Sequence, residues 1–338
     1  MAEALGARIL RTWVATAIVC AGLALTALEA SAQSLPKDAA SRVELYAIPT
    51  LTISDTQFLN GDVNGTPVTV SGEFRLAQGS GRMPVVVLMH GSSGVGAGME
   101  PWVHTFNAMG ISTFVIDGFS GRGLTTVGQD QALLGRLNFI VDIYRSLEIL
   151  AKHPRVDPER IALMGFSRGG QAALFASLNR FDKLWNKSGI RLAAYIPFYP
   201  DCSTSYVGDT DVAERPIRIF HGTPDDYNPV ASCKAYVARL LEARRDVILT
   251  EYPDSEHAFD IGLLGISSKV VSANAQTVRH CSIKEGEGGV LMNADTREPF
   301  SYKDDCVERN PHVGGNPATA EQARKAVSDF LLALFKLG

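Results

Sequence analysis

The sequence is short of several features that would point to particular classes of protein. Its 32 Lys and Arg residues stand against 36 Asp and Glu residues, so it lacks the basic excess that nucleic-acid binding requires. It contains no internal repeat, low-complexity tract or heptad pattern, which excludes solenoid and coiled-coil architectures. Cysteine and tryptophan are sparse, with 5 and 3 residues, whereas 46% of the chain is hydrophobic. This balance is typical of a globular protein with one large core.

The N-terminus has the three-part composition of a secretory signal peptide. Arg8 and Arg11 supply positive charge, residues 13–28 are uncharged and mostly apolar, and Ala30-Ser31-Ala32 fits an A-x-A cleavage site. The apolar run is shorter than the about 20 residues of a membrane span. We therefore expect residues 1–32 to be removed after Ala32, leaving a periplasmic or secreted protein with no stable membrane anchor. An uncleaved N-terminal anchor is the alternative.

Short apolar runs alternate with helical patterns through most of the remaining chain. Continuous apolar runs predict buried strands, and apolar residues at helical spacing predict helices. The predicted strands are residues 84–89, 111–116, 160–164, 193–198, 216–220 and 247–252, and the predicted helices are residues 102–109, 131–152, 171–178, 230–244 and 318–337. Residues 67–71 and 74–76 alternate between apolar and polar, which predicts a half-buried pair of strands.

This alternation of strand and helix indicates an α/β protein with a mostly parallel central sheet and helices on both faces. We expect one catalytic domain over residues 33–338. Within it, residues from about 260 to 317 form an irregular, glycine-rich extension, and the closing helix follows.

Gly165-Phe166-Ser167-Arg168-Gly169 lies between a predicted strand and a predicted helix. The pattern G-x-S-x-G in that context is the nucleophile elbow of an α/β-hydrolase. The tight turn lifts the serine hydroxyl out of the sheet and places Ser167 at a helix N-terminus, which favours developing negative charge. Because the motif alone also fits an ordinary glycine-serine turn, partner residues are needed to support the assignment.

A serine nucleophile needs a base, usually a histidine, that is itself oriented by a carboxylate. The histidines after Ser167 are His221, His257, His280 and His312. His257 directly follows the last predicted strand, where an α/β-hydrolase carries its base. We therefore predict that His257 is the base; the alternative is that it is an ordinary surface or core histidine.

The acid must come between the serine and the base in the chain order of an α/β-hydrolase. Asp225 and Asp226 both follow the predicted strand that ends at Phe220, and Asp201 follows an earlier strand. Chain order alone leaves these three aspartates open.

Backbone N–H groups near Ser167 would hold the oxyanion. The elbow supplies the N–H of Arg168, and the loop after an earlier central strand, His90-Gly91-Ser92-Ser93-Gly94, supplies a second donor, for which we choose Ser92. The same stretch also fits a plain loop. For the Arg168 side chain, a salt bridge to an acidic neighbour is favoured over contact with an anionic substrate.

Four cysteines remain once the signal peptide is removed: Cys202, Cys233, Cys281 and Cys306. An even number in an oxidising compartment favours disulfides over four free thiols, and four cysteines allow three pairings. Cys202 follows one predicted strand and Cys233 begins the helix after a neighbouring strand, so we predict that they pair at the active-site edge of the sheet. The remaining pair, Cys281 and Cys306, would then staple the extension beside His257.

Five stretches of the chain form a set when taken in order: residues 84–91 (PVVVLMHG), 117–123 (DGFSGRG), 156–170 (VDPERIALMGFSRGG), 221–225 (HGTPD) and 257–260 (HAFD). Together they resemble the dienelactone hydrolase family of α/β-hydrolases. In the family pattern the acid stands three residues after the glycine of His-Gly and four before a proline. Gly222, Asp225 and Pro229 fit this spacing and Asp226 does not, so the resemblance implies Ser167, Asp225 and His257 as the triad.

Family members that open dienelactones use a cysteine nucleophile, and the cytoplasmic members lack an export signal. This chain, with Ser167, is therefore expected to be an exported hydrolase of carboxylic esters or lactones. We expect a small-molecule ester as substrate, with no metal, organic cofactor or nucleic-acid partner. Two other interpretations stay open: a peptidase or acyltransferase on the same fold, and a catalytically silent binding protein.

Overall fold

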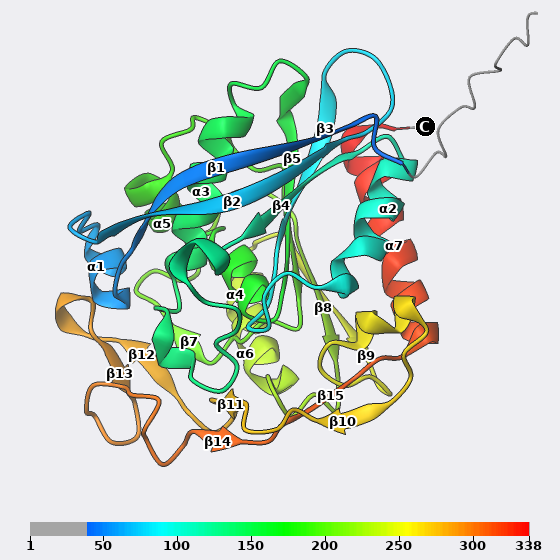
Figure 1. Cartoon of the computed structure of the whole chain (residues 1–338). Helices are drawn as coiled ribbons and strands as arrows, with labels where there is room; N and C mark the ends of the chain where they lie inside the picture. The colour runs from blue at the N-terminus through cyan, green and yellow to red at the C-terminus, as the bar shows by residue number, and fades with distance from the viewer. Residues whose placement is uncertain (1–38, 338) are drawn as a thin grey trace, which may run out of the picture. The chain divides into compact units, whose positions relative to one another are not determined.

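Eight strands form one sheet in the order β1-β2-β4-β3-β5-β6-β8-β9 in the computed structural model, which describes residues 39–337 (Figure 1). From β4 to β9 in this order the strands run parallel, whereas β2 is antiparallel to both of its neighbours, β1 and β4. The strands are β1 (Arg42–Thr52), β2 (Thr66–Leu76), β3 (Met83–Met89), β4 (Ser112–Asp117), β5 (Val156–Phe166), β6 (Ala194–Phe198), β8 (Ile217–Gly222) and β9 (Val247–Tyr252). The sequence-based prediction of a mostly parallel α/β-hydrolase sheet is confirmed.

Seven α-helices and five 3₁₀ turns connect these strands within the described residues. The α-helices are α1 (Asp55–Asn60), α2 (Glu100–Ala108), α3 (Asn138–Leu150), α4 (Arg168–Phe175), α5 (Asn179–Trp185), α6 (Val230–Glu242) and α7 (Pro317–Phe335). The 3₁₀ turns are η1 (Ala97–Met99), η2 (Ser120–Arg122), η3 (Gln131–Leu133), η4 (Phe259–Leu264) and η5 (Glu287–Gly289).

Helices cover both faces of the sheet, which explains why β3 is an unbroken apolar run. Side chains of a strand alternate between the two faces. Val87 and Met89 pack with residues of α3 to α6, whereas Val86 and Leu88 pack with α2 and α7. All seven residues of β3 are buried, so neither face leaves room for a polar position.

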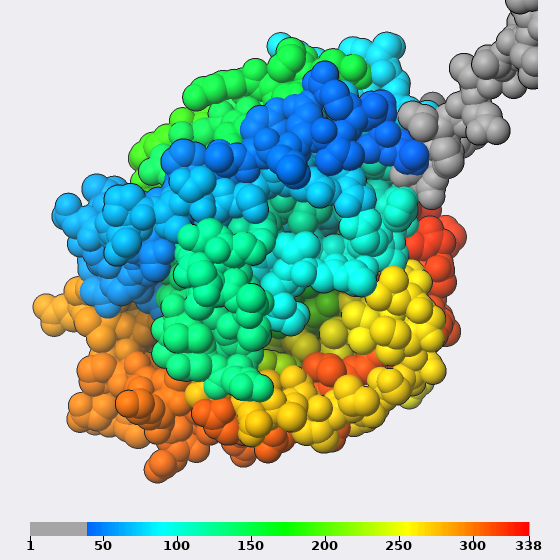
Figure 2. All heavy atoms as spheres, viewed as in Figure 1, coloured from blue at the N-terminus to red at the C-terminus, as the bar shows by residue number. Residues whose placement is uncertain are grey.

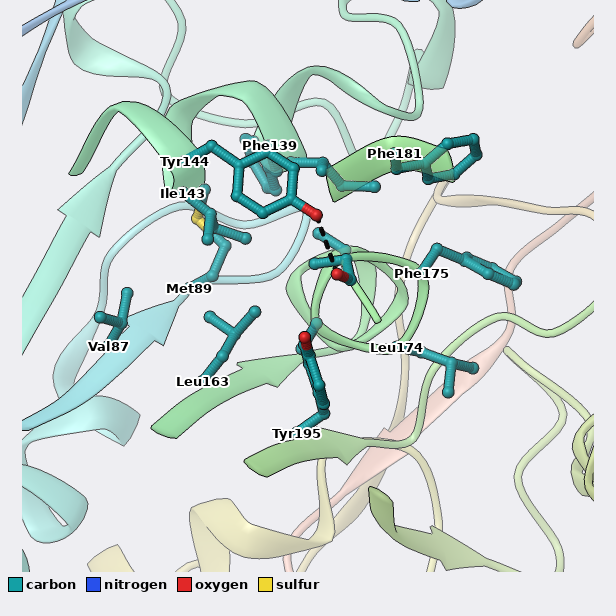
Figure 3. Packing of buried hydrophobic residues seen from close by; sticks show 14 of the residues in the cluster. Val87, Met89, Phe139, Ile143, Tyr144, Leu163, Leu174, Phe175, Phe181 and Tyr195 are labelled. Atoms are coloured by element: carbon teal, nitrogen blue, oxygen red, sulfur yellow. Dashed lines mark hydrogen bonds between the residues drawn. The ribbon is translucent and has the colours of Figure 1, made fainter. Parts of the chain in front are cut away.

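The packing on the first of these faces surrounds the elbow helix α4. Figure 3 shows Ile143 and Tyr144 of α3 above the strand residues Leu163 and Tyr195. The Tyr144 hydroxyl donates a hydrogen bond of 2.8 Å to the carbonyl of Ala176, just after α4. This bond satisfies the one polar atom that Tyr144 brings into the core, and it ties α3 to the end of α4.

The C-terminal extension, which we define as residues 265–316, contains only short strands and the 3₁₀ turn η5, and it runs along the lower edge of Figure 1 in yellow and orange. β10 (Lys269–Val271) pairs with β15 (His312–Gly314), β11 (Gln276–Thr277) with β14 (Glu308–Arg309), and β12 (Ile283–Glu285) with both β13 (Leu291–Asn293) and β7 (Thr204–Ser205). A disulfide joins Cys281 to Cys306 within it. The expected irregular segment thus consists of small two- and three-stranded sheets and loops.

Two sequence-based expectations about secondary structure are wrong. The expected strand pair over residues 67–71 and 74–76 is the single strand β2, whose partners are β1 and β4. The helix expected over residues 131–152 begins only at Asn138, because residues 131–133 form a 3₁₀ turn and Gly135 follows it.

The expected signal peptide lies outside the described residues. Between residues 39 and 337, the structure has no helix with both the length and the apolar content that crossing a membrane requires.

Candidate active site

Ser167 lies at the turn between β5 and α4, in a backbone conformation that residues other than glycine rarely adopt. Its φ is 54° and its ψ is −115°, which places strain at the tip of the turn. The turn closes tightly because Gly165 and Gly169 have no side chains. A Cβ on Gly165 would lie 2.0 Å from the carbonyl oxygen of Gly169, and one on Gly169 would lie 2.2 Å from that of Met89. The elbow geometry therefore depends on both glycines of the G-x-S-x-G pattern.

The structure brings Ser167, His257 and Asp225 together in one hydrogen-bonded chain, which we call the candidate triad. His257 Nε2 lies 2.9 Å from Ser167 Oγ, and His257 Nδ1 lies 2.8 Å from Asp225 Oδ2. These partners require the proton on Nδ1 and leave Nε2 free to accept the serine proton. A hydroxyl, an imidazole and a carboxylate in this order can generate a serine nucleophile.

Asp225 is fixed by the loop that follows β8. Its Oδ1 accepts hydrogen bonds of 2.8 Å from the backbone N–H groups of both Tyr227 and Asn228, while Oδ2 faces His257. The side chain is fully buried, so the carboxylate has a single orientation.

Aromatic side chains enclose the His257 ring, and sequence reasoning missed them. The Tyr227 ring stacks on it with centroids 4.6 Å apart, and the Tyr199 ring meets it edge-on at the same distance. The Tyr199 hydroxyl donates a 2.6 Å hydrogen bond to Asp260, which also accepts one from Trp102 Nε1. Burial raises the pKa of Asp260. In the sequence, only Asp260, the last residue of the H-A-F-D stretch, pointed to these residues around His257.

The competing aspartates are held elsewhere. Asp226 accepts hydrogen bonds from the backbone N–H and the ring Nδ1 of His312, and it pairs with Arg279 at 3.2 Å. Although partial burial opposes the effect, these partners lower the pKa of Asp226. Asp201 forms a buried ion pair with Arg136. Neither aspartate contacts His257.

The remaining histidines also have partners of their own. His221 is buried, with Nδ1 3.0 Å from the carbonyl oxygen of Gly222, and burial lowers its pKa. His280 lies near the surface, 3.4 Å from Glu308.

The loop after β3 approaches Ser167 from the other side of the elbow. A Cβ on Gly91 would lie 3.2 Å from the Cβ of Ser167, so the loop backbone passes directly beside the serine. His90 anchors the loop: its Nδ1 donates to the Gly91 carbonyl at 2.7 Å, and its Nε2 accepts the N–H of Gly118 at 3.0 Å. Burial lowers the pKa of His90 to about 4, which keeps this ring neutral. Ser92, the predicted donor, lines the cleft beside Ser167.

The Arg168 side chain differs from the sequence-based expectation of a salt bridge. Its guanidinium donates to Gln131 Oε1 at 2.6 Å and to the carbonyls of Leu134 and Gly135, all of them uncharged. The backbone N–H of Arg168 is the first of α4 and has no acceptor within the helix, since the first turn of a helix leaves its N–H groups unpaired. The two parts of this residue therefore face different surroundings.

A cleft of about 430 Å³ opens over the candidate triad. Ser167, His257 and the loop after β3 form one wall, and the extension contributes the small residues Ala273, Ala275 and Val313. In Figure 2 the surface is hollowed between the cyan loop after β3 and the yellow part of the chain. A larger cavity of about 710 Å³ between β1 and α3 contains none of the predicted residues.

Both cysteine pairs expected from the sequence are disulfides in the structure. Cys202 pairs with Cys233, linking the segment after β6 to the first turn of α6. Cys281 pairs with Cys306 inside the extension. The extension reaches the candidate triad through a 2.9 Å hydrogen bond from the N–H of Gly314 to the carbonyl of His257.

This chain has matches among solved structures and among protein-family models. A dienelactone hydrolase-like promiscuous phosphotriesterase from metagenomic libraries has a similar structure, with a TM-score of 0.53 and 15% identity over 86% of this chain and 98% of that one. A carboxylesterase from Lactobacillus plantarum WCFS1 gives a TM-score of 0.46 and 15% identity over 65% and 86% of the two chains. A search of the curated proteins finds no match. The model of the dienelactone hydrolase family matches residues 74–278, and the chain therefore belongs to that family.

Proposed function

We propose that this protein is an exported serine hydrolase that cleaves carboxylic esters or lactones through Ser167, His257 and Asp225. One observation carries the proposal. Three side chains from separate loops at one edge of the sheet form a continuous hydrogen-bonded chain beneath an open cleft. A purely structural cluster would not need a nucleophile with φ 54°.

The proposed reaction has two steps. In the first, His257 Nε2 takes the proton of Ser167 as its Oγ attacks the carbonyl carbon, and the tetrahedral intermediate then expels the alcohol, which receives that proton. The product is an acyl-enzyme on Ser167. In the second step, His257 deprotonates water, which attacks the acyl carbonyl, and Ser167 recovers its proton as the acid leaves. Asp225 keeps the imidazole in the required tautomer and stabilises its charged form.

The oxyanion of each intermediate would be held by the backbone N–H groups of Arg168 and Ser92. The unpaired helical N–H at Arg168 and the close approach of Gly91 to Ser167 support this assignment. The residues of the triad and these two donors complete the set that ester cleavage requires, without a further group.

Export is supported by composition and by the disulfides. Two disulfides suit an oxidising compartment, in agreement with the signal-peptide pattern at residues 1–32. The proposed location is the periplasm or the outside of the cell.

Hydrolysis of p-nitrophenyl acetate by the purified exported protein tests the function. We expect clear turnover by the wild type and a loss on the order of 10⁶-fold in kcat for Ser167→Ala. Ser282→Ala, at an exposed position of the extension, is the matched control and should retain full activity. A folded Ser167→Ala variant that keeps most of the activity would assign the nucleophile elsewhere, and an inactive wild type would favour a binding protein.

A further inference from the structure

A second, smaller cavity adjoins Ser167 and has no role in the proposed reaction. Its volume is about 40 Å³, and it shares Ser92, Ser167 and Tyr227 with the larger cleft. Arg136, Arg168 and Gln171 also line it. A space of this size holds about one water-sized or chloride-sized particle.

Three buried side chains around this cavity carry hydrogen-bond donors without acceptors among residues 39–337. The unpaired atoms are Nε and Nη1 of Arg136, Nε of Arg168 and Nε2 of Gln171. Each of the three residues is at most 5% exposed. Leaving a buried donor unpaired is costly, and native proteins rarely do so. Because all four atoms are donors, whatever satisfies them must supply acceptors.

The charges around the cavity favour an anion as that acceptor. The Arg168 guanidinium contacts only uncharged oxygens, so its positive charge has no carboxylate in contact. Arg136 pairs with Asp201, and Asp55 acts on both arginines only at longer range. Buried charges in proteins are normally paired. The two arginines therefore exceed the acids in direct contact with them by one charge.

The extension supplies part of the cavity wall, with Gln276, Thr277 and Tyr302 among the lining residues. The rings of Phe300 and Tyr302 lie 5.9 and 6.0 Å from the guanidinium of Arg136. Both belong to the loop that the disulfide between Cys281 and Cys306 closes. The volume of about 40 Å³ limits the cavity to a small anion.

We propose that this cavity binds one small monovalent anion, of chloride or carboxylate size, through Arg136, Arg168 and Gln171. The anion is either a free ion or a carboxylate that an ester substrate carries. It supplies acceptors to the unpaired donors and balances the charge of Arg168 next to the nucleophile elbow.

Thermal unfolding of the full exported protein at constant ionic strength tests the site, with sodium chloride exchanged for sodium gluconate. Gluconate is too large for the cavity. We expect Tm to rise saturably with chloride, by about 2 to 4 °C, and not with gluconate. Identical unfolding curves in the two salts would mean that the cavity holds water, which contradicts the proposal.

A variant at Gln171 locates the effect. Gln171→Leu removes one unpaired donor with little change in volume, so the chloride-dependent rise in Tm should shrink by at least half. Arg239→Gln is the control, since Arg239 pairs with Asp209 away from the cavity, and it should keep the full rise. An equal rise in Gln171→Leu and the wild type would place the bound chloride elsewhere.

Steady-state kinetics distinguish a free anion from the carboxylate of a substrate. Of the experiments on this cavity, only this one rests on the proposed esterase activity. Monomethyl succinate and methyl butyrate are compared at increasing chloride. A KM that rises only for the carboxylated ester assigns the site to the substrate's carboxylate, and unchanged KM values for both esters assign it to a free ion. Both outcomes support an anion site when the thermal result is positive.

Discussion

The parallel sheet and the C-terminal extension both line the cleft, but different interactions stabilise the two regions. The central strands of the sheet are apolar, and β3 and β6 are buried at every residue. The extension has few buried apolar residues, among them Ile283 and Leu291, and is held by a disulfide and by polar contacts. All members of the candidate triad come from loops of the sheet, whereas the extension supplies cleft walls and a cover. The candidate triad is therefore positioned by the packed sheet, whereas the disulfide-linked extension shapes the entrance to the cleft.

The largest difference between the sheet and the extension is expected from substituting two neighbouring aspartates. Asp225 faces His257, and Asp226 faces the extension through His312. We predict that Asp225→Asn lowers kcat on the order of 10⁴-fold, because the imidazole loses the partner that fixes its tautomer. Asp226→Asn should cost less than about tenfold. Steady-state kinetics on both variants decide the matter, and equal losses or the reverse order would overturn the acid assignment.

Shortening an apolar side chain should destabilise the protein more in the sheet than in the extension. Leu163 is fully buried in β5, and Val270 of the extension is 50% exposed. We predict that Leu163→Ala costs about 2 to 5 kcal/mol in the free energy of unfolding, because it leaves a cavity in a packed core. Val270→Ala should change it by less than about 0.5 kcal/mol. Urea denaturation measures both, and similar losses would mean that the extension is packed as tightly as the sheet.

The disulfide of the extension should matter more than its apolar packing. Replacing both Cys281 and Cys306 by Ala opens a loop with a sequence separation of 25 residues. In the chain-entropy model we expect a loss of about 3 kcal/mol in the free energy of unfolding. Denaturation of the double variant beside the wild type gives the value. An unchanged stability would show that polar contacts alone hold the extension.

The smallest predicted effect is the pH dependence of stability that comes from His90, the neutral histidine that anchors the loop after β3. Because the folded pKa of His90 is about 4 and the ordinary value is near 6.5, the unfolded chain binds a proton first as the pH falls. His90 therefore contributes stability above pH 6.5, and this contribution is lost as the pH falls towards 4. Its share between pH 6.5 and 5 is about 2 kcal/mol. Buried His221, whose pKa is also lowered, adds to the same slope.

Denaturation at several pH values checks this prediction. His90→Gln should flatten the fall in stability between pH 6.5 and 5. His280→Gln, at the surface, is the control and should leave the slope unchanged. An unchanged slope in His90→Gln would mean that His90 is not held neutral by burial.

Much of the sheet was predictable because buried parallel strands have unbroken apolar runs. The strands around Val87 and Leu163 were found for this reason. β1 was missed because one of its faces is exposed and it contains Pro49, features that suit an edge strand. β2 was split in two at Gly72, where the structure has no turn. Gly72 instead makes room for the Phe114 ring, since a Cβ there would lie 2.3 Å from it.

The candidate site was predictable only where a motif or a chain order marks it. Ser167 and His257 follow from the elbow and from the order of strands, and Asp225 follows from the family spacing. The cluster of Tyr199, Asp260 and Trp102 was not predictable, because its contacts join segments far apart in the chain. The surroundings of Arg168 were misjudged for the same reason: its acceptors are carbonyls of a turn that the sequence had assigned to a helix.

Covalent labelling tests the central claim, that Ser167 is a nucleophile activated by His257. The exported protein is treated with a fluorophosphonate, digested and mapped by mass spectrometry. We predict one adduct, on the peptide that contains Ser167, and at least a hundredfold slower labelling of His257→Gln. An adduct on another residue, or none on Ser167 in a protein that hydrolyses esters, would contradict the account.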